Sequence, residues 1–346
     1  MGGGAEPNAL AAIVGGVDAN PVFAMSLGSK ELFHSNLLAW YIRHHQPVAE
    51  ALGFRGEVTV LREKDHTDLL IRHGQHQATI IENKVFALPD TGQLARLAER
   101  PEAAASDLVL LSLTSPGWPG GIWTSPGGRS WTWLSYRQLG ERLGPAVPAV
   151  AAADAYAAAT LEHWLDHFTQ LEDLARAVGR PSADEPVMLP ADQRKVLQVA
   201  RLDAAVQKMR CQQVAAGLAA RGIPAHVDLT RGTGLIDWFT GGPDGLQRGW
   251  QLQGDQFRLA IVVPRHHPGY GRDAKNRRAR EEEALRQAGF FDFSLLPAAI
   301  AAAPAHGFRH YAPDFVYRYV PVAGITVGQA VQAGTEYAGR ISKLAS

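Results

Sequence analysis

The sequence contains a single cysteine, Cys211, in a chain of 346 residues. One thiol cannot form an intramolecular disulfide, and it cannot supply the several ligands of a cysteine-based zinc cluster. The sequence around Cys211 offers no partner that would activate the thiol as a nucleophile. We therefore expect Cys211 to pack on the buried side of a helix.

Net charge is also absent, since 34 Lys and Arg residues balance 34 Asp and Glu residues. A neutral chain has no overall attraction to nucleic acid, so any site for nucleic acid must rest on a local basic patch. Lysine in particular is scarce, with seven residues in the whole chain. A lysine inside an apolar stretch, as Lys84 is between Ile80 and Phe86, is therefore not easily explained by composition.

Long apolar runs are missing as well. The alanine-rich stretch 146–161 contains Pro148 and Asp154, and it is too short and too weakly apolar to cross a bilayer. The sequence begins Met1-Gly2-Gly3-Gly4, without the basic region and apolar core of a signal peptide. We expect a cytoplasmic protein with no membrane partner.

The first half of the chain alternates between apolar strands and amphipathic helices. Residues 1–25 are rich in Gly, Ala and Pro and predict a mobile start. Over 26–179, short buried strands alternate with helices of 3.6-residue periodicity, which favours an α/β domain on a mixed sheet. Residues 180–190 are polar and contain proline, and they predict a linker.

Beyond the linker, residues 191–346 predict a second, α+β domain that recognises a substrate, ligand or partner. It opens with a helix over 192–221, which Gly222 and Pro224 end. Short strands between 225 and 263 are separated by turn residues, which is typical of an antiparallel meander. Further elements are expected in this order: a charged helix over 273–288, a strand within 308–320 and a helix over 326–344.

The chemically distinctive stretch is Thr67–Gln93, which predicts two strands, a polar turn between them and a helix after them. Side chains on a strand alternate between its two faces, so Glu82 and Lys84 share one face, while Ile81, Asn83 and Val85 take the other. A hairpin symmetric about Gln75 places Asp68 opposite Glu82. Two carboxylates and one ammonium group would then meet at one place on a sheet.

These residue types suit phosphodiester hydrolysis with a bound Mg²⁺ ion, for which Mn²⁺ can substitute. Mg²⁺ prefers a few carboxylates plus water, and it acts as Lewis acid and template. Asp68 and Glu82 would be the ligands, with the backbone carbonyl of Asn83 as a third. Lys84 would orient the attacking water, and Gln93, in the first turn of the next helix, would position water or the nucleic-acid backbone. The alternative is an ion pair at a strand end without chemistry.

A further carboxylate, Glu31, lies in the first turn of a helix expected over 30–45. It either interacts favourably with the helix dipole or completes the shell of the metal ion. Both interpretations stay open from the residues alone.

Several short segments follow one another in a distinctive order between residues 25 and 175. They are Glu31-Leu32-Phe33-His34-Ser35-Asn36-Leu37-Leu38-Ala39-Trp40, Thr67-Asp68, Ile81-Glu82-Asn83-Lys84, Gln93-Leu94, Leu113-Thr114-Ser115-Pro116-Gly117 and Ser135-Tyr136. In this order they resemble the motifs of a bacterial branch of the PD-(D/E)xK nuclease superfamily. Thr67 stands where the superfamily has proline, a departure that does not touch a ligand.

The resemblance implies a restriction-endonuclease-like fold, in which helices flank a mixed sheet. It also implies a Mg²⁺-dependent nuclease with Glu31, Asp68, Glu82 and Lys84 in the active site. The motifs do not distinguish DNA from RNA, or endonuclease from exonuclease. We expect DNA as the substrate, and defence against foreign DNA fits by analogy of fold.

The second domain carries a local basic patch, in a loop and on the helix that follows it. Its residues are Arg265, His266, His267, Arg272, Lys275, Arg277, Arg278 and Arg280. The acidic run Glu281-Glu282-Glu283 follows at once. The patch therefore either contacts nucleic-acid phosphates or forms a solvated helix with internal ion pairs. Trp238 and Trp250, in expected strands, are assigned to the core rather than to base stacking.

Histidines near the hairpin raise the question of a zinc site. His44, His45, His66, His73 and His76 are expected in turns and at helix ends, where exposed histidine is ordinary, so we expect no zinc. A supporting role beside the substrate stays open for His66 and His73, which flank the hairpin.

Two other functions remain open, together with a homodimeric assembly. The chain could be a catalytically silent nuclease fold that binds nucleic acid, although its intact Asp68, Glu82 and Lys84 argue against this. It could also be a nuclease gated by a ligand that binds the C-terminal domain.

Overall fold

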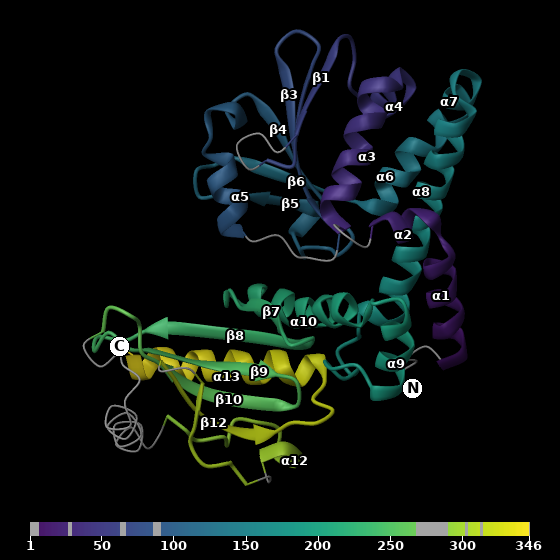
Figure 1. Ribbon diagram of the computed structural model, residues 1–346. Helices are drawn as coiled ribbons and strands as arrows, with labels where there is room; N and C mark the ends of the chain where they lie inside the picture. The colour runs from purple at the N-terminus through teal and green to yellow at the C-terminus, as the bar shows by residue number, and fades with distance from the viewer. Residues whose placement is uncertain are drawn as a thin grey trace. The chain divides into compact units, whose positions relative to one another are not determined.

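The computed structural model describes residues 7–26, 30–62, 67–85, 91–267, 290–301, 304–311 and 314–345. The chain divides into two compact units, whose elements are labelled in Figure 1. The N-terminal unit comprises Ala5–Gly179 and Lys195–Ala205, and the C-terminal unit comprises Arg180–Arg194 and Val206–Ser346. Each unit contains a sheet of several strands flanked by helices, so the protein is of mixed α/β class.

Within the described residues, six strands form the sheet of the N-terminal unit in the order β1-β2-β3-β4-β6-β5. The pairs β1–β2, β2–β3 and β5–β6 are antiparallel, whereas β3–β4 and β4–β6 are parallel. The sheet is therefore mixed, as predicted. The strands are β1 (Val58–Arg62), β2 (Leu69–His73), β3 (Gln77–Lys84), β4 (Ser106–Ser112), β5 (Ile122–Thr124) and β6 (Ser130–Ser135).

Helices cover both faces of this sheet. On one face, Leu94 and Leu97 of helix α5 pack in a core cluster with Ile80 and Leu110. On the other face, α3 and α6 contact β3 through side-chain hydrogen bonds, and α8 packs beside α6. The helices are α3 (Lys30–His44), α4 (Gln46–Ala51), α5 (Thr91–Ala98), α6 (Tyr136–Leu143), α7 (Val147–Ala153) and α8 (Ala155–Leu174), the last followed by a π-helical turn (Ala175–Gly179).

The start of the chain differs from the prediction. The structure forms helices α1 (Pro7–Ala19) and α2 (Pro21–Ser26) where the sequence suggested a mobile segment. The reason is a short apolar stripe, because Leu10, Val14 and Val17 follow helical spacing and are buried. This stripe packs against α8.

Within the described residues, the C-terminal unit also holds a six-stranded sheet, ordered β11-β12-β10-β9-β8-β7. All its pairs are antiparallel, and β7 to β10 follow one another as the predicted meander. The strands are β7 (His226–Thr230), β8 (Thr233–Gly241), β9 (Gln247–Gln253), β10 (Gln256–Val262), β11 (Arg309–Tyr311) and β12 (Phe315–Pro321). The helices wholly in this unit are α12 (Ala298–Ala301) and α13 (Val327–Ala345). Helix α10 (Asp203–Ala219) belongs to it from Val206 onward, and α9 (Ala191–Val199) belongs to it up to Arg194.

The core of the C-terminal unit lies between its sheet and the helices α10 and α13. Trp250 and Phe257 stack within it, and Tyr337 of α13 packs on the Phe257 ring. Cys211 is fully buried on α10, and burial raises the pKa of its thiol to about 12. The thiol is therefore uncharged and packed on a helix. Trp238 packs, half-buried, against the same core.

The segment predicted as a linker is bound to the C-terminal unit. The backbone N–H of Val187 donates to Ile325 at 2.9 Å, and the N–H of Gly328 donates to Ala183 at 2.7 Å. Val187 itself is fully buried in the core. Residues 180–190 thus belong to the fold rather than to a spacer, because they supply backbone acceptors and an apolar anchor.

The helix expected over 192–221 is interrupted. The N–H of Leu202 donates to Leu197 and the N–H of Arg201 donates to Gln198, which is the hydrogen-bond pattern of a Schellman motif. Arg201 adopts φ of 56° at the position that glycine usually takes. With no glycine or proline there, the sequence carried no signal for the break between α9 and α10.

No helix in the described part of the chain is both long enough and apolar enough to span a membrane.

Candidate active site

The β2–β3 hairpin sets Asp68 beside Glu82. Leu69 pairs with Ile81 across the two antiparallel strands, so Asp68, directly before β2, falls opposite Glu82. This is the register that symmetry about the turn predicts. The Oδ2 atom of Asp68 accepts a hydrogen bond from the backbone N–H of Asn83 at 2.7 Å, which ties the carboxylate to β3.

Glu82 is the centre of a buried polar cluster, with 1% of its surface exposed. Its Oε1 atom lies 2.8 Å from Nζ of Lys84, which is on the same face of β3 two residues later. The side-chain amide of Gln93 donates to the same oxygen at 2.8 Å. A buried carboxylate is stable only with such partners, because transfer of an isolated charge from water costs several kcal/mol. Asp68, Glu82, Lys84 and Gln93 are thus brought together at one end of β3.

Helix α5 positions Gln93, because the apolar side of this helix packs on the sheet. Leu94 is fully buried against the sheet, and its carbonyl accepts a hydrogen bond from Nε1 of Trp131 at 3.2 Å. Ile80, Glu82 and Lys84 share the face that α5 covers, since alternate residues of a strand point to the same side. Gln93, one residue before the buried Leu94, therefore reaches the end of β3 where Glu82 lies.

On the opposite face of β3, Asn83 joins three elements. Its side-chain amide donates to Oγ of Ser35 in α3 at 2.9 Å. Its Oδ1 atom accepts a hydrogen bond from the hydroxyl of Tyr136, the first residue of α6, at 2.5 Å. All three side chains are buried or nearly so. Helices α3 and α6 therefore fix the position of β3 from the sheet face opposite Glu82.

This Ser35–Asn83–Tyr136 network was not predicted from the sequence. Each of its members lies in one of the quoted segments, so those segments, far apart in the chain, meet in space. The signal in the sequence was the presence of all three residues in the quoted segments. The backbone N–H of Asn83 also serves Asp68, which links the network to the carboxylates.

Histidine 34 supports the packing of α3 on α8 beside this network. Its Nδ1 atom accepts a hydrogen bond from Nε1 of Trp164 at 2.9 Å, and its ring stacks on His167 with centroids 5.6 Å apart. Burial, with a smaller contribution from His167, lowers the pKa of His34 to about 3. Burial also lowers the pKa of His167 to about 4. Both rings are neutral near pH 7 and act in packing.

The predicted Glu31 lies in the first turn of α3, and its side chain is outside the described part of the structure. Ser35, one turn later, contacts β3. Among the residues that the structure describes, no three His, Cys, Asp or Glu side chains form a metal-holding group. Asp68 and Glu82 supply carboxylate oxygens, and one or two carboxylates plus water is the donor set that Mg²⁺ takes. This pair fits such an ion.

The other residues singled out from the sequence lie in the C-terminal unit, outside the described residues, or at the far end of the hairpin. Arg265 lies in a turn after β10 in the C-terminal unit, and Arg272, Lys275, Arg277 and Arg278 are outside the described residues. His66 is outside them as well. His73 was expected in an exposed turn but is buried, because β2 extends to it and its ring packs on Phe54. Its Nε2 atom lies 3.2 Å from Oγ1 of Thr79.

No family model matches this chain, and neither a curated protein nor a solved structure shows significant similarity to it.

Proposed function

We propose that this chain is a metal-dependent nuclease with a restriction-endonuclease-like N-terminal unit, and that it hydrolyses phosphodiester bonds of DNA. The observation that supports it most directly is the convergence on Glu82: Lys84 and Gln93 both contact one of its oxygens, and Asp68 lies opposite. These are the residues expected from the motifs, and they come from three separate elements.

In this proposal, Asp68 and Glu82 hold a Mg²⁺ ion, to which the carbonyl of Asn83 is a further candidate ligand. When bound, the ion supplies Lewis-acid activation of the phosphate and a template for in-line attack. The hydrogen bond from the Asn83 N–H holds the Asp68 carboxylate in one orientation. Glu31 is a candidate for completing the set of ligands, as the resemblance implies.

Lys84 is the proposed group that orients the attacking water and offsets charge on the phosphate. Its ammonium is partly buried, with 15% of the side chain exposed, and Glu82 fixes its position at 2.8 Å. A cation preorganised in a site with little water stabilises developing negative charge far better than one in bulk solvent. The Gln93 amide, held by the same carboxylate, would orient water or a phosphate oxygen beside it.

The competing interpretation is a buried ion pair that serves only the fold. A buried pair of this kind is weak support for stability, because apolar residues of similar size often stabilise a protein as well or better. Here the pair lies with a second carboxylate and a side-chain amide at one strand end. Clusters of this kind, with charges held against the cost of burial, are typical of functional sites.

The test compares cleavage of plasmid DNA, single-stranded DNA and RNA with Mg²⁺ or Mn²⁺ by the wild type and by Asp68→Asn, Glu82→Gln and Lys84→Ala. We expect each substitution to lower the cleavage rate by about 100-fold or more, since removal of one preorganised group in such a site costs this much. Plasmid and linear substrates together distinguish endonuclease from exonuclease activity.

Arg72→Ala is the matched control, because Arg72 lies in the same hairpin but is exposed. It should cleave like the wild type. Equal rates for all variants would attribute the activity to a contaminant or to another site. A wild type that binds DNA without cutting it would instead favour the catalytically silent fold.

A second candidate is a nuclease gated by a ligand, and one specific feature favours it. The C-terminal unit contains a cavity of about 670 Å³, which is within the range of small-molecule sites. If the cavity gates cleavage, a substitution in its lining should change the cleavage rate without any change at Asp68, Glu82 or Lys84.

A further inference from the structure

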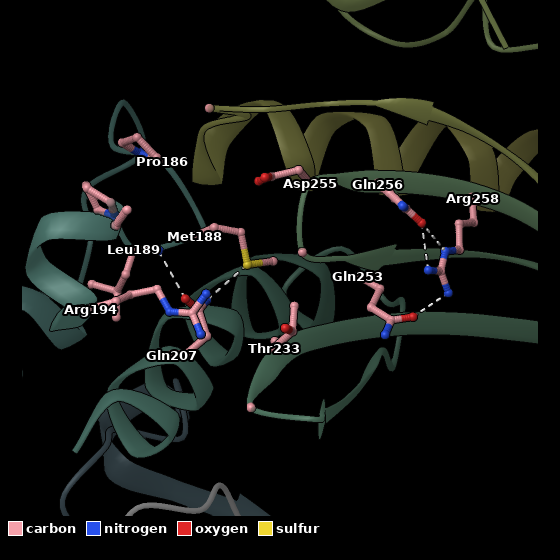
Figure 2. Close-up of a pocket in the computed structure, with 16 residues that line it drawn as sticks. Pro186, Met188, Leu189, Arg194, Gln207, Thr233, Gln253, Asp255, Gln256 and Arg258 are labelled. Atoms are coloured by element: carbon pink, nitrogen blue, oxygen red, sulfur yellow. Dashed lines mark hydrogen bonds between the residues drawn. The ribbon is translucent and has the colours of Figure 1, made fainter. Parts of the chain in front are cut away.

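The cavity of the C-terminal unit lies at one end of its sheet (Figure 2). Its walls come from the segment before α9, from the start of β8, and from the turn between β9 and β10. Gly254, in that turn, adopts φ of 55° and approaches Thr233 so closely that a Cβ atom would lie 2.9 Å from Cγ2. Glycine suits this position, because the turn needs a left-handed backbone and packs directly against Thr233.

The cavity is lined from two sides, as Figure 2 shows. On one side Met188 supplies apolar surface beside Leu189, which is 5% exposed, and the Gln207 amide and Arg194 lie with them. Gln253, Gln256 and Arg258 form a polar side on β9 and β10. A molecule that satisfies both walls has an apolar body and a polar group at one end.

Arg258 is the charged group of the polar side. On β10 its neighbours Phe257 and Leu259 point into the core, so Arg258 points to the other face of the sheet. Its Nε and Nη2 atoms donate to Oε1 of Gln256 at 3.1 and 2.7 Å. Its Nη1 atom donates to Gln251 at 2.8 Å and also to Gln253.

The partners of Arg258 are all uncharged. No carboxylate among the described residues forms an ion pair with it, and its guanidinium lies over the ring of Tyr317, 4.7 Å from the centroid. Burial lowers the pKa of Arg258, and Tyr317 and Tyr319 oppose this shift in part. Glutamine amides orient the guanidinium, but a neutral acceptor forms hydrogen bonds about half as strong as those of an anion.

The charges along the cavity favour an anionic occupant. A second guanidinium, that of Arg194 on α9, also lines it. The carboxylate among the described lining residues is that of Asp255, which is exposed in the β9–β10 turn. The guanidinium of Arg258 is planar and can bind two oxygens of one phosphate or carboxylate at once.

We propose that this cavity binds a small organic anion, whose phosphate or carboxylate displaces the glutamine amides on Arg258 and whose apolar body rests on Met188 and Leu189. The size of the cavity suits a molecule of nucleotide dimensions. The site belongs to the C-terminal unit, so the proposal is independent of nuclease activity in the N-terminal unit.

The experiment measures binding to the full-length protein by thermal shift and by calorimetry. The probes are AMP for a phosphate on a nucleoside, 3-phenylpropionate for a carboxylate on an apolar body, inorganic phosphate for the anion alone, and adenosine for the nucleoside without the anion. We expect AMP or 3-phenylpropionate to raise the melting temperature and to bind more tightly than adenosine or inorganic phosphate. Which of the two binds identifies the anion as phosphate or carboxylate.

Substitutions locate the site. Arg258→Gln should weaken binding by about 10- to 100-fold, the loss expected for hydrogen bonds to a charged group, whereas Arg258→Lys should weaken it less because the charge remains. Met188→Ala should weaken binding of the organic anion but not of inorganic phosphate. Arg309→Gln, an exposed arginine of the same unit on β11, is the control and should bind like the wild type.

Two results would overturn the proposal. One is the absence of binding to the wild type by every organic anion tested at millimolar concentration. The other is unchanged affinity in an Arg258→Gln protein that melts at the wild-type temperature.

Discussion

Two neighbouring histidines of the N-terminal unit, His34 and His167, are buried in their neutral form. In the unfolded chain each titrates near the usual histidine pKa of 6.5, whereas burial lowers the pKa to about 3 for His34 and about 4 for His167. Between these values the unfolded state binds more protons than the folded state. The free energy of unfolding therefore falls as the pH drops below about 6.5.

We expect the N-terminal unit to lose on the order of 2 kcal/mol of stability per histidine between about pH 7.5 and about pH 5. Urea unfolding at the two pH values measures this. His167→Phe keeps a ring against His34 but removes one titrating group, so it should reduce the loss. His163→Asn, at an exposed position of the same helix, should leave the loss as in the wild type.

A single residue can also serve two faces of a strand, as Asn83 does. Its backbone N–H orients Asp68, while its side chain binds Ser35 and Tyr136. Sequence reasoning placed Asn83 correctly on the face away from Glu82, because alternation along a strand is fixed by geometry. The identity of its partners depended on how α3 and α6 pack, which alternation does not determine.

At the scale of elements, β3 is held by a helix on each side of the sheet. Gln93 of α5 contacts Glu82 from one side, and α3 and α6 hold Asn83 from the other. The end of β3, where the proposed chemistry lies, is therefore fixed by tertiary contacts rather than by the hairpin alone. This is the rigidity that a preorganised site requires.

Removal of one hydrogen bond from this network should destabilise the N-terminal unit measurably. We expect Tyr136→Phe and Ser35→Ala each to cost about 1 to 2 kcal/mol, because each removes one buried hydrogen bond to the Asn83 amide. Urea unfolding of the two single variants and the double variant measures both the cost and the coupling. Simple additivity in the double variant would show that Ser35 and Tyr136 act independently.

At the scale of the whole molecule, the chain forms two compact units with separate sheets. We expect two unfolding transitions, each sensitive to substitutions in its own unit. In the C-terminal unit, a Cβ atom on Gly249 would lie 2.1 Å from the backbone oxygen of Trp238, so Gly249→Ala should lower one transition by more than about 2 kcal/mol.

Calorimetry of three variants measures this. Gly249→Ala should shift one transition and Tyr136→Phe the other. Gly241→Ala is the control, because a Cβ atom there meets no neighbour within 4 Å. A single transition that all destabilising variants shift equally would show that the two units unfold together.

The sequence predicted much of the fold where the signal was local. Alternation and turn chemistry located the β2–β3 hairpin, its register and the C-terminal meander, because these depend on neighbouring residues. The predictions from sequence were wrong where contacts between distant segments determine the local structure. Helix α1 forms because a short apolar stripe finds α8, and residues 180–190 fold because Val187 enters a distant core.

The candidate site shows the same division. Asp68, Glu82 and Lys84 could be placed together from strand geometry, and Gln93 from the capped helix that follows. The Arg258 cavity could not be found in this way, because its lining comes from segments that only the folded sheet brings together. The three glutamines that bond to Arg258 show no distinctive pattern in the sequence. Their role as hydrogen-bond acceptors becomes evident only in the folded sheet.

The network around Asn83 has a consequence for how this protein can change over evolutionary time. Asn83 lies between the two charged residues of the site, Glu82 and Lys84. Here it carries a side chain whose donor and acceptor are both satisfied by residues about 50 positions away in each direction. Replacement at Asn83 alone removes a buried hydrogen bond from Ser35 and another from Tyr136, so we expect substitutions at positions 35, 83 and 136 to be coupled.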